Sequence, residues 1–258
     1  MRIALLQMSA VPGDVAANLA RIAEAAANAA RRGAELLIAP ELATIGYGAG
    51  DGLRDLAEPR DGAQVAGLAA IAAASGLAII AGFPEQDGAA VYNSALFTDG
   101  HAAPVVYRKS HLYGDYERSY FAPGDPVATL AEWRGLKLGM LICYDVEFPE
   151  NVRRLAVAGA DFVAVPTALP VSPEAAFIAK RMIPVRAFEN QIFVAYANHT
   201  GRDDHFAYAG ISHVVAPDGG TLAMASVTEA RVIIADIRPG DYLRSRDANA
   251  YLRDLRLS

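Results

Sequence analysis

Cysteine is almost absent from this chain, and that absence restricts the class of protein. Cys143 is the single cysteine among 258 residues, so no intrachain disulfide can form. A secreted fold stapled by disulfides is therefore excluded, and a reducing cytoplasm is the compartment that we expect.

Long apolar runs are missing as well. A membrane-spanning helix needs about 18 or more consecutive apolar residues, whereas the alanine-rich region 62–83 is interrupted by Ser75, Gly76 and Gly82. The apolar run Ile3–Leu6 is too short for the core of a signal peptide. We expect a soluble protein without a membrane partner.

A surplus of basic residues is also lacking. The chain has 23 Lys and Arg against 29 Asp and Glu, which gives a formal net charge of −6. Proteins that bind nucleic acids usually carry a basic surplus, so we expect no nucleic-acid partner. Hydrophobic residues make up 53% of the chain, which excludes general disorder and supplies one large core.

Motifs that bind metals or nucleotides are missing too. The five histidines show neither the paired helical spacing nor the dense histidine and acid clusters of a metal site. Gly46, Gly48, Gly50 and Gly52 alternate without opening a helix after a strand, as a dinucleotide fingerprint requires. We expect no metal and no cofactor.

The first third of the chain alternates between strand-like and helix-like patterns. Short apolar runs at Arg2–Met8, Glu35–Ala39 and Leu77–Phe83 have the length of buried strands. Between them lie a helical pattern that Asp14 can cap and a second one over Gln64–Ala74. This order predicts an α/β sheet covered by helices.

The remainder predicts a second sheet within the same domain. The dipeptide Asp99-Gly100 between two apolar runs is a hairpin signal. With the strands that follow, about a dozen are expected, which favours two sheets over one. We predict a single domain over residues 1–258, with a polar tail from about 239 that is exposed or packs on a partner. The later segments expected are strands Leu136–Ile142, Asp161–Pro166, Phe193–Ala197, Gly210–Ala216, Leu222–Ala225 and Arg231–Ile237, helix 150–158, and helix Pro173–Asn190 kinked at Pro184.

Cys143 is the first candidate for chemistry. It follows an apolar strand and precedes a helix that Pro149 can begin. The positive end of a helix lowers the pKa of a thiol and favours the nucleophilic thiolate. Most free cysteines, however, are small buried apolar residues, and position alone favours that alternative.

Glu41 and Lys109 each follow a predicted strand. A carboxylate at the carboxyl end of a buried strand lies where α/β folds place their sites, and burial would let Glu41 act as a base. Lys109 can stabilise an oxyanion or a thiolate. Taken singly, each is more often an ordinary solvated charge.

Three stretches around these residues occur in a recognisable order. They are Ala39-Pro40-Glu41-Leu42, Tyr107-Arg108-Lys109-Ser110-His111-Leu112, and Leu141-Ile142-Cys143-Tyr144-Asp145 with Phe148-Pro149-Glu150. On these stretches the sequence, from Arg2 to about Ile237, resembles the nitrilase or carbon–nitrogen hydrolase superfamily, whose enzymes use a Glu-Lys-Cys triad.

The resemblance implies a fold, an assembly and a set of roles. It implies a two-sheet α-β-β-α sandwich that pairs through its helices into a homodimer or a higher homo-oligomer. It implies Glu41 as general base, Lys109 as oxyanion stabiliser and Cys143 as nucleophile, with the backbone N–H of Tyr144 completing the oxyanion hole. A second glutamate often lies four residues before an F-x-P-G motif, here Phe121–Gly124, and this gives Glu117 a supporting role. A surface acid is the alternative for Glu117.

Within the superfamily the sequence looks most like small aliphatic amidases, including 5-aminovaleramide amidase and R-stereoselective amidases. The stretches that carry this likeness are Tyr107–Gly114, Cys143–Arg154, Val165–Leu169 and Tyr196–His199. Positions expected to line the substrate pocket are Tyr47, Tyr144, Glu147, Ala168 and Asn198.

Glu147 gives an independent indication of the substrate. Many superfamily members that act on carboxylate-bearing substrates have an arginine near this position, whereas an acid repels a carboxylate and attracts an ammonium group. The alternative is an acid that stabilises the start of the following helix.

The expected reaction is hydrolysis of a small aliphatic carboxamide through a thioester on Cys143. An ω-amino carboxamide is one form that the substrate can take. A nitrilase or an N-carbamoyl amide hydrolase would use the same triad. A catalytically silent binding protein on this scaffold is the alternative of another class.

Overall fold

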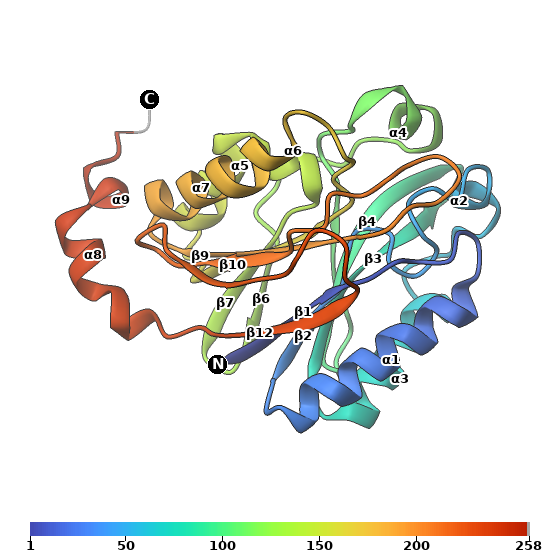
Figure 1. Ribbon diagram of the computed structural model, residues 1–258, viewed down its shortest axis with the longest axis horizontal. Helices are drawn as coiled ribbons and strands as arrows, with labels where there is room; N and C mark the ends of the chain where they lie inside the picture. Colours follow the sequence, from blue (N-terminus) through green and yellow to red (C-terminus); the bar gives the residue numbers. More distant parts are fainter. Residues whose placement is uncertain (257–258) are drawn as a thin grey trace.

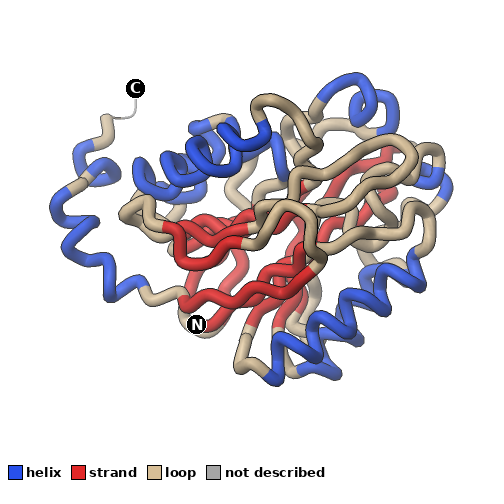
Figure 2. Tube along the Cα trace, in the orientation of Figure 1, coloured by secondary structure: helices blue, strands red, loops and turns tan. Residues whose placement is uncertain are grey.

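Two six-stranded sheets form the centre of the molecule (Figures 1 and 2). The computed structural model describes residues 1–256, so the last two residues of the expected tail lie outside it. The strand orders are β12-β1-β2-β3-β4-β5 and β11-β10-β9-β8-β7-β6. The bounds are β1 Arg2–Gln7, β2 Leu36–Ile38, β3 Ala78–Asp87, β4 Ala90–Thr98, β5 Val105–Arg108, β6 Leu130–Trp133, β7 Leu136–Met140, β8 Phe162–Thr167, β9 Phe193–Asn198, β10 His213–Val215, β11 Thr221–Met224 and β12 Arg231–Asp236.

Helices cover the outer face of each sheet. Helices α1 (Val15–Arg31) and α3 (Ala63–Ser75) lie on the first sheet, and α5 (Pro149–Val157) and α7 (Ile183–Asn190) lie on the second (Figure 1). The predicted α-β-β-α architecture is confirmed. Asp14 caps α1, since its side chain accepts a hydrogen bond from the backbone N–H of Ala17.

Parallel strands occupy the middle of each sheet and explain the continuous apolar runs. β1, β2 and β3 pair in parallel, as do β7, β8 and β9. Strands covered on both faces need apolar residues at every position, without alternation. In β1, Leu5 belongs to the cluster between the sheets and Ala4 to the cluster beneath α1.

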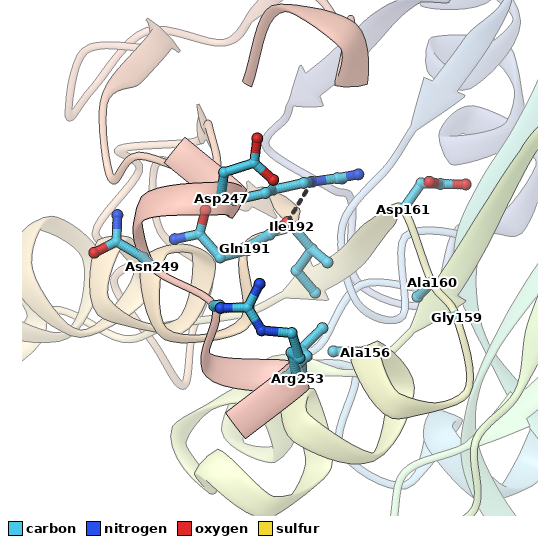
Figure 3. Close-up of a pocket in the computed structure, with 12 residues that line it drawn as sticks. Ala156, Gly159, Ala160, Asp161, Gln191, Ile192, Asp247, Asn249 and Arg253 are labelled. Atoms are coloured by element: carbon cyan, nitrogen blue, oxygen red, sulfur yellow. Dashed lines mark hydrogen bonds between the residues drawn. The ribbon is translucent and has the colours of Figure 1, made fainter. Parts of the chain in front are cut away.

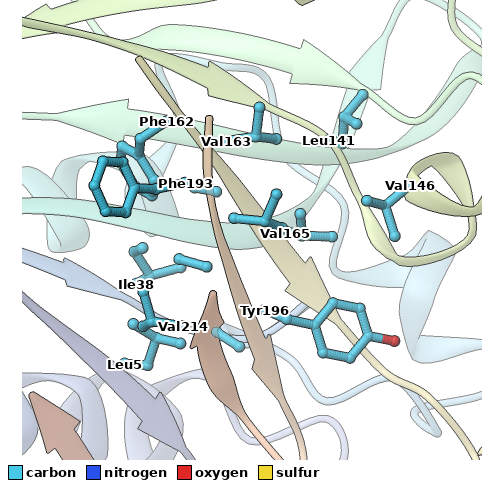
Figure 4. Close-up of a cluster of buried hydrophobic side chains, with 14 of the residues drawn as sticks. Leu5, Ile38, Leu141, Val146, Phe162, Val163, Val165, Phe193, Tyr196 and Val214 are labelled. Carbon is cyan, nitrogen blue, oxygen red and sulfur yellow. The ribbon is translucent and has the colours of Figure 1, made fainter. Parts of the chain in front are cut away.

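The main core lies between the two sheets. Figure 4 shows Leu5 and Ile38 of the first sheet together with Phe162, Phe193 and Val214 of the second. All five side chains are fully buried. Burial of apolar area on this scale fixes the distance between the sheets, and therefore the distance between groups at their ends.

The expected helix Pro173–Asn190 runs without a gap from Ala175 to Asn190, with a π segment inside it. Residues Ala175–Phe177 form a short helix (α6), Ile178–Met182 form a π turn, and α7 begins at Ile183. Pro184 has no backbone N–H to offer the preceding turn, so the regular hydrogen-bond ladder cannot cross it. The sequence therefore located the irregularity, while its form is a π turn rather than a simple kink.

The polar tail packs against its own chain. It forms a short 3₁₀ turn (Pro239–Tyr242) and helices α8 (Leu243–Ala248) and α9 (Tyr251–Asp254). The ring of Tyr242 lies edge-on to Phe193, and Tyr251 lies edge-on to Phe188. A cavity of about 390 Å³ separates the tail from the end of α5 and the start of β8; Figure 3 shows Asp161 and Arg253 on opposite sides of it.

Among residues 1–256, no helix is long and apolar enough to cross a membrane. Within the same part of the chain, no group of three or more histidine, cysteine, aspartate or glutamate side chains is arranged to hold a metal ion.

Candidate active site

Strand ends from both sheets deliver the candidate side chains. Glu41 follows β2 and Lys109 directly follows β5, both in the first sheet. Cys143 comes three residues after β7 of the second sheet and begins a 3₁₀ turn, Cys143–Glu147. Glu117 lies on α4 (Gly114–Tyr120), a short helix that the sequence analysis did not predict.

These four residues form one buried cluster. The Nζ of Lys109 lies 2.7 Å from Oε1 of Glu41 and 2.6 Å from Oε1 of Glu117. The three side chains are at most 1% exposed. Cys143 is buried beside them, and the charges of all three act on its thiol. The residues selected from three separate motifs therefore meet at one place.

The ammonium of Lys109 stays charged in this cluster. Burial alone would lower its pKa, but the carboxylates of Glu117 and Glu41 outweigh burial and hold the pKa well above its ordinary value. Glu117 shows the opposite balance. Burial, together with the nearby charge of Glu41, raises the pKa of Glu117 to about 7 in spite of Lys109. Three charged groups thus share two ion pairs, and Glu117 is the carboxylate whose pKa rises toward neutrality.

The environment of Cys143 corrects one expectation. We expected the adjoining helix to lower the pKa of the thiol, but burial and the charge of Glu41 raise it well above its ordinary value, and Lys109 offsets only part of the increase. Burial is the largest of these influences because the sulfur is enclosed. Cys143 is therefore a thiol in the free protein and needs a base to become a nucleophile.

Cys143 also has an unusual backbone. Its φ is +45°, in the left-handed region that residues other than glycine rarely adopt. Strain of this kind often occurs at functional sites, where the surrounding structure enforces it. Here it turns the chain sharply from β7 into the 3₁₀ turn.

Glu41 is held from two sides and keeps one oxygen free. The Nδ2 of Asn93 donates to Oε1 at 2.7 Å, and the Nε2 of His199 lies 2.7 Å from the main-chain oxygen of Glu41. Oε2 is buried and has no hydrogen-bond partner within residues 1–256. A carboxylate oxygen that is buried and unpaired is available to accept a proton.

The sequence did not identify Gly82 on β3 as a residue that shapes the site. A Cβ at this position would lie 2.1 Å from the backbone nitrogen of Leu42, which no rearrangement of a side chain could relieve. Leu42 itself has a φ of +49°. The available signal was a glycine inside a buried apolar strand, which marks a close backbone approach.

Tyr47 contacts the second glutamate. Its hydroxyl donates to Oε1 of Glu117 at 2.9 Å, and the backbone N–H of Tyr113 donates to Oε2 at 2.8 Å. Burial and the charge of Glu117 raise the pKa of Tyr47 well above its ordinary value, so it remains a donor. These two bonds fix Glu117 against Lys109.

The other predicted pocket residues lie around Cys143 in different ways. The backbone of Ala168 forms a hydrogen bond with the thiol. Asn198 is bonded to backbone on both sides, accepting from Leu169 N–H at 2.9 Å and donating to Gly210 O at 2.8 Å. It therefore holds the segment that carries Ala168.

Tyr144 and Glu147 lie on the turn that Cys143 begins. Both are half-buried, and the ring of Tyr144 packs edge-on against Tyr113 and Phe148. Burial raises the pKa of the Glu147 carboxyl, and the charges of Lys109 and Arg186 oppose that rise. Glu147 is thus close enough to Lys109 for the ammonium to lower the pKa of its carboxyl.

Comparison with known proteins agrees with this arrangement. The profile of the Carbon-nitrogen hydrolase family matches residues 2–246. The hydrolase in the pqqF 5' region of Pseudomonas protegens is 44% identical, over 99% of this chain and 89% of its own length. An (R)-stereoselective amidase of a Pseudomonas species is 36% identical, over 95% of this chain and 91% of its own length.

A solved structure provides a further comparison. The crystal structure of an amidase from a Nesterenkonia species superposes with a TM-score of 0.88 at 36% identity, and covers 99% of this chain and 93% of that one. A variant of the Nesterenkonia amidase carries acrylamide added to its active-site cysteine. Cys143 is the only cysteine of the present chain.

Proposed function

Because this chain belongs to the carbon–nitrogen hydrolase family, we propose that it hydrolyses a small aliphatic carboxamide to a carboxylic acid and ammonia. The protein is an amidase of the nitrilase superfamily with a cysteine nucleophile. One observation carries the roles proposed below. It is the buried Glu41–Lys109–Glu117 cluster beside Cys143.

The first half of the reaction acylates Cys143. Glu41 accepts the thiol proton on its unpartnered Oε2, and the sulfur attacks the amide carbon. Lys109 and the backbone N–H of Tyr144 hold the oxyanion, which in a buried site contributes roughly 3–4 kcal/mol per donor. The C–N bond then breaks, Glu41 returns the proton to the leaving nitrogen, and ammonia departs from a thioester.

The second half releases the acid. Glu41 takes a proton from water, and the resulting hydroxide attacks the thioester carbon. The C–S bond breaks, the product leaves as a carboxylic acid, and the sulfur regains the proton that Glu41 holds. Glu117 supports both halves by holding the ammonium of Lys109 through a second hydrogen bond, in addition to the one that Glu41 accepts.

The size and charge of the substrate follow from the pocket residues. A related Nesterenkonia amidase has been solved with butyramide, which supports a short aliphatic acyl group. Glu147 adds an acidic group near the cluster and carries no side-chain hydrogen bond within residues 1–256. A free acid at this place favours an ω-ammonium group on the substrate and disfavours a carboxylate. Tyr47 and Ala168 complete the lining that we propose.

Ammonia release from a substrate panel tests this proposal. The panel contains 5-aminovaleramide, butyramide, an ω-amido acid, an aliphatic nitrile and an N-carbamoyl amine. We expect turnover of the first two and little of the amido acid. Preference for the nitrile would indicate the chemistry named for a Pyrococcus abyssi relative, which is 32% identical and called a nitrilase. Preference for the carbamoyl amine would overturn the amide assignment, and preference for the amido acid would overturn the substrate charge that we propose from Glu147.

Substituting Glu147 separates charge recognition from general damage. In Glu147→Gln we expect the KM for 5-aminovaleramide to rise about tenfold while the KM for butyramide stays unchanged, because only the first substrate carries a cation. Butyramide is thus the internal control. An equal change for both substrates would mean that Glu147 acts only on the start of α5.

We also propose that two copies pair through the helices on the second sheet. Val157 on α5, Phe177 on α6 and Val185 on α7 are between 50% and 60% exposed in the single chain. Large apolar side chains on neighbouring helices are typical of a surface that another protein covers.

A further inference from the structure

The candidate nucleophile and the candidate oxyanion donor lie on different sheets. Lys109 follows β5 at one edge of the first sheet, and Cys143 follows β7 of the second. Hydrogen bonds within a sheet therefore cannot fix the position of one relative to the other. Packing of the core sets the distance between the sheets, and a contact between the two strand ends can align them further; a buried carboxylate lies there.

Asp145 is that carboxylate, and its oxygens are occupied by residues on both sides of Lys109. Oδ2 accepts a hydrogen bond from the hydroxyl of Tyr107 at 2.9 Å. Oδ1 accepts from the hydroxyl of Ser110 at 2.9 Å and from the backbone N–H of His111 at 2.8 Å. The imidazole Nδ1 of His111 lies 3.0 Å from the same oxygen.

The same carboxylate also binds its own turn. The backbone N–H of Ile142 lies 3.3 Å from Oδ2, and the N–H of Asp145 donates to the carbonyl of Ile142 at 3.0 Å. Ile142 immediately precedes Cys143. One side chain thus connects the residues beside the nucleophile with the residues beside Lys109.

Asp145 is satisfied without a strong cation. Its side chain is fully buried, and within residues 1–256 no lysine or arginine forms an ion pair with it; His111 is the one basic side chain in contact with it. Taking a carboxylate out of water is costly unless several donors converge on it. Here the hydrogen bonds to Asp145 are short. Tyr107 remains protonated, because burial and the charge of Asp145 raise its pKa well above the ordinary value.

We propose that Asp145 is a positioning residue that sets Lys109 against Cys143 by bonding Tyr107, Ser110 and His111 to the nucleophile turn. It touches neither the reacting sulfur nor the ammonium, so its influence passes through the two backbones it joins. A displacement of about 1 Å between reacting groups can lower a rate by about 10²-fold. The inference deepens the proposed function, because it assumes that Lys109 and Cys143 act together.

The variant Asp145→Asn tests the inference with almost no change of volume. An amide keeps one acceptor oxygen and turns the other into a donor, which must then face a hydroxyl or an N–H. We expect kcat for the best amide of the panel to fall 10- to 100-fold with KM changed less than threefold, since positioning acts in the transition state. We also expect alkylation of Cys143 by iodoacetamide, followed by intact mass, to slow about tenfold.

Trp133→Phe is the matched control. The indole N–H of Trp133 on β6 donates to the carbonyl of Glu35 at 3.0 Å, and so forms another bond between the two sheets. It lies at the opposite ends of β2 and β7 from Glu41 and Cys143. We expect this variant to have a lower melting temperature than the wild type, with an unchanged kcat and an unchanged alkylation rate of Cys143.

The outcomes separate the inference from a purely structural role and from the proposed function. Equal losses of kcat in the two variants at equal melting temperature, or an unchanged alkylation rate in Asp145→Asn, would overturn the inference. If the wild type hydrolyses no amide, the proposed function fails, while alkylation still tests Asp145. Should Asp145→Asn not fold, Tyr107→Phe and Ser110→Ala each remove one hydrogen bond to Asp145, and we expect their effects on kcat to be smaller and not additive.

Discussion

At the scale of single residues, the site works through a conflict between burial and charge. Enclosure makes Cys143 a poor acid and Glu117 a weak one, while Lys109 stays an ammonium because two carboxylates face it. A thiol of this kind is protected from unselective oxidation and reacts when a base is at hand. In the proposed reaction Glu41 is that base, through Oε2, which has no hydrogen-bond partner within residues 1–256.

Replacement of the sulfur is the first residue-scale prediction. Cys143→Ala should lower kcat by on the order of 10³-fold or more, because the covalent step is lost. The fold should persist, since alanine leaves only a small cavity there. Ammonia release and a thermal melt measured on the same sample check both parts. Substantial residual turnover would refute the nucleophile assignment.

Glu117 gives a prediction about pH. Its pKa is about 7 in the folded chain and near 4.5 when unfolded, so between these values the folded chain holds a proton that the unfolded chain has released. The resulting stabilisation is full below about 4.5 and is lost as the pH rises through 7. The melting temperature of the wild type relative to Glu117→Gln should therefore fall between pH 5 and pH 8. A constant difference would contradict the raised pKa.

At the scale of elements, backbone approach matters as much as side-chain chemistry. The Glu41–Leu42 backbone lies directly against β3 at Gly82. Gly82→Ala should cost about 1–3 kcal/mol of stability and lower kcat as well, because relief of the clash must displace Glu41. Denaturant unfolding and ammonia release check the two effects.

Gly67→Ala serves as the control for that variant. A Cβ at Gly67 on α3 would meet only the flexible end of Leu19, at 2.9 Å. Alanine also favours the helix over glycine. We expect kcat to be unchanged in this variant, and an equal loss of kcat in both would show that the effect of Gly82 is not local.

Elements with strong periodic or capping signals could be predicted from the sequence, and short irregular ones could not. The order β1–α1–β2 followed from apolar runs and from Asp14, and the β4–β5 hairpin followed from Asp99-Gly100. Strand β6 and helix α4 were missed, because four to seven residues carry too little pattern to stand out from a loop. Glu117 was found only through the family motif, since nothing in its surroundings predicts the helix that holds it.

Contacts between distant segments were the other part that the sequence could not supply. The convergence of Glu41, Lys109 and Cys143 depends on how two sheets face each other, and no local pattern encodes that geometry. Burial of the thiol, which reversed the expected direction of its pKa, has the same origin. Asp145 belongs to the third motif, but its hydrogen-bond partners lie more than 30 residues from it along the sequence, so the motif alone does not indicate its role.

At the scale of the whole molecule, the exposed apolar helices on the second sheet give an assembly prediction. The wild type should show twice the 27.2 kDa chain mass or a higher multiple by light scattering. Val185→Asp should shift it toward the single-chain mass, because burying an unpaired charge in an interface is costly. Val171→Asp, at an exposed residue outside these helices, is the control. A single-chain mass for the wild type would rule out the pairing.

The last strand of the chain has a consequence for biosynthesis. β12, over Arg231–Asp236, pairs with β1 along its whole length and forms the outer edge of the first sheet. During synthesis on the ribosome, the edge of β1 that pairs with β12 therefore stays unpaired until nearly the entire chain has been made. An unpaired strand edge invites pairing with other chains. We expect nascent chains that stall before residue 231 to depend on chaperones more than the complete chain does.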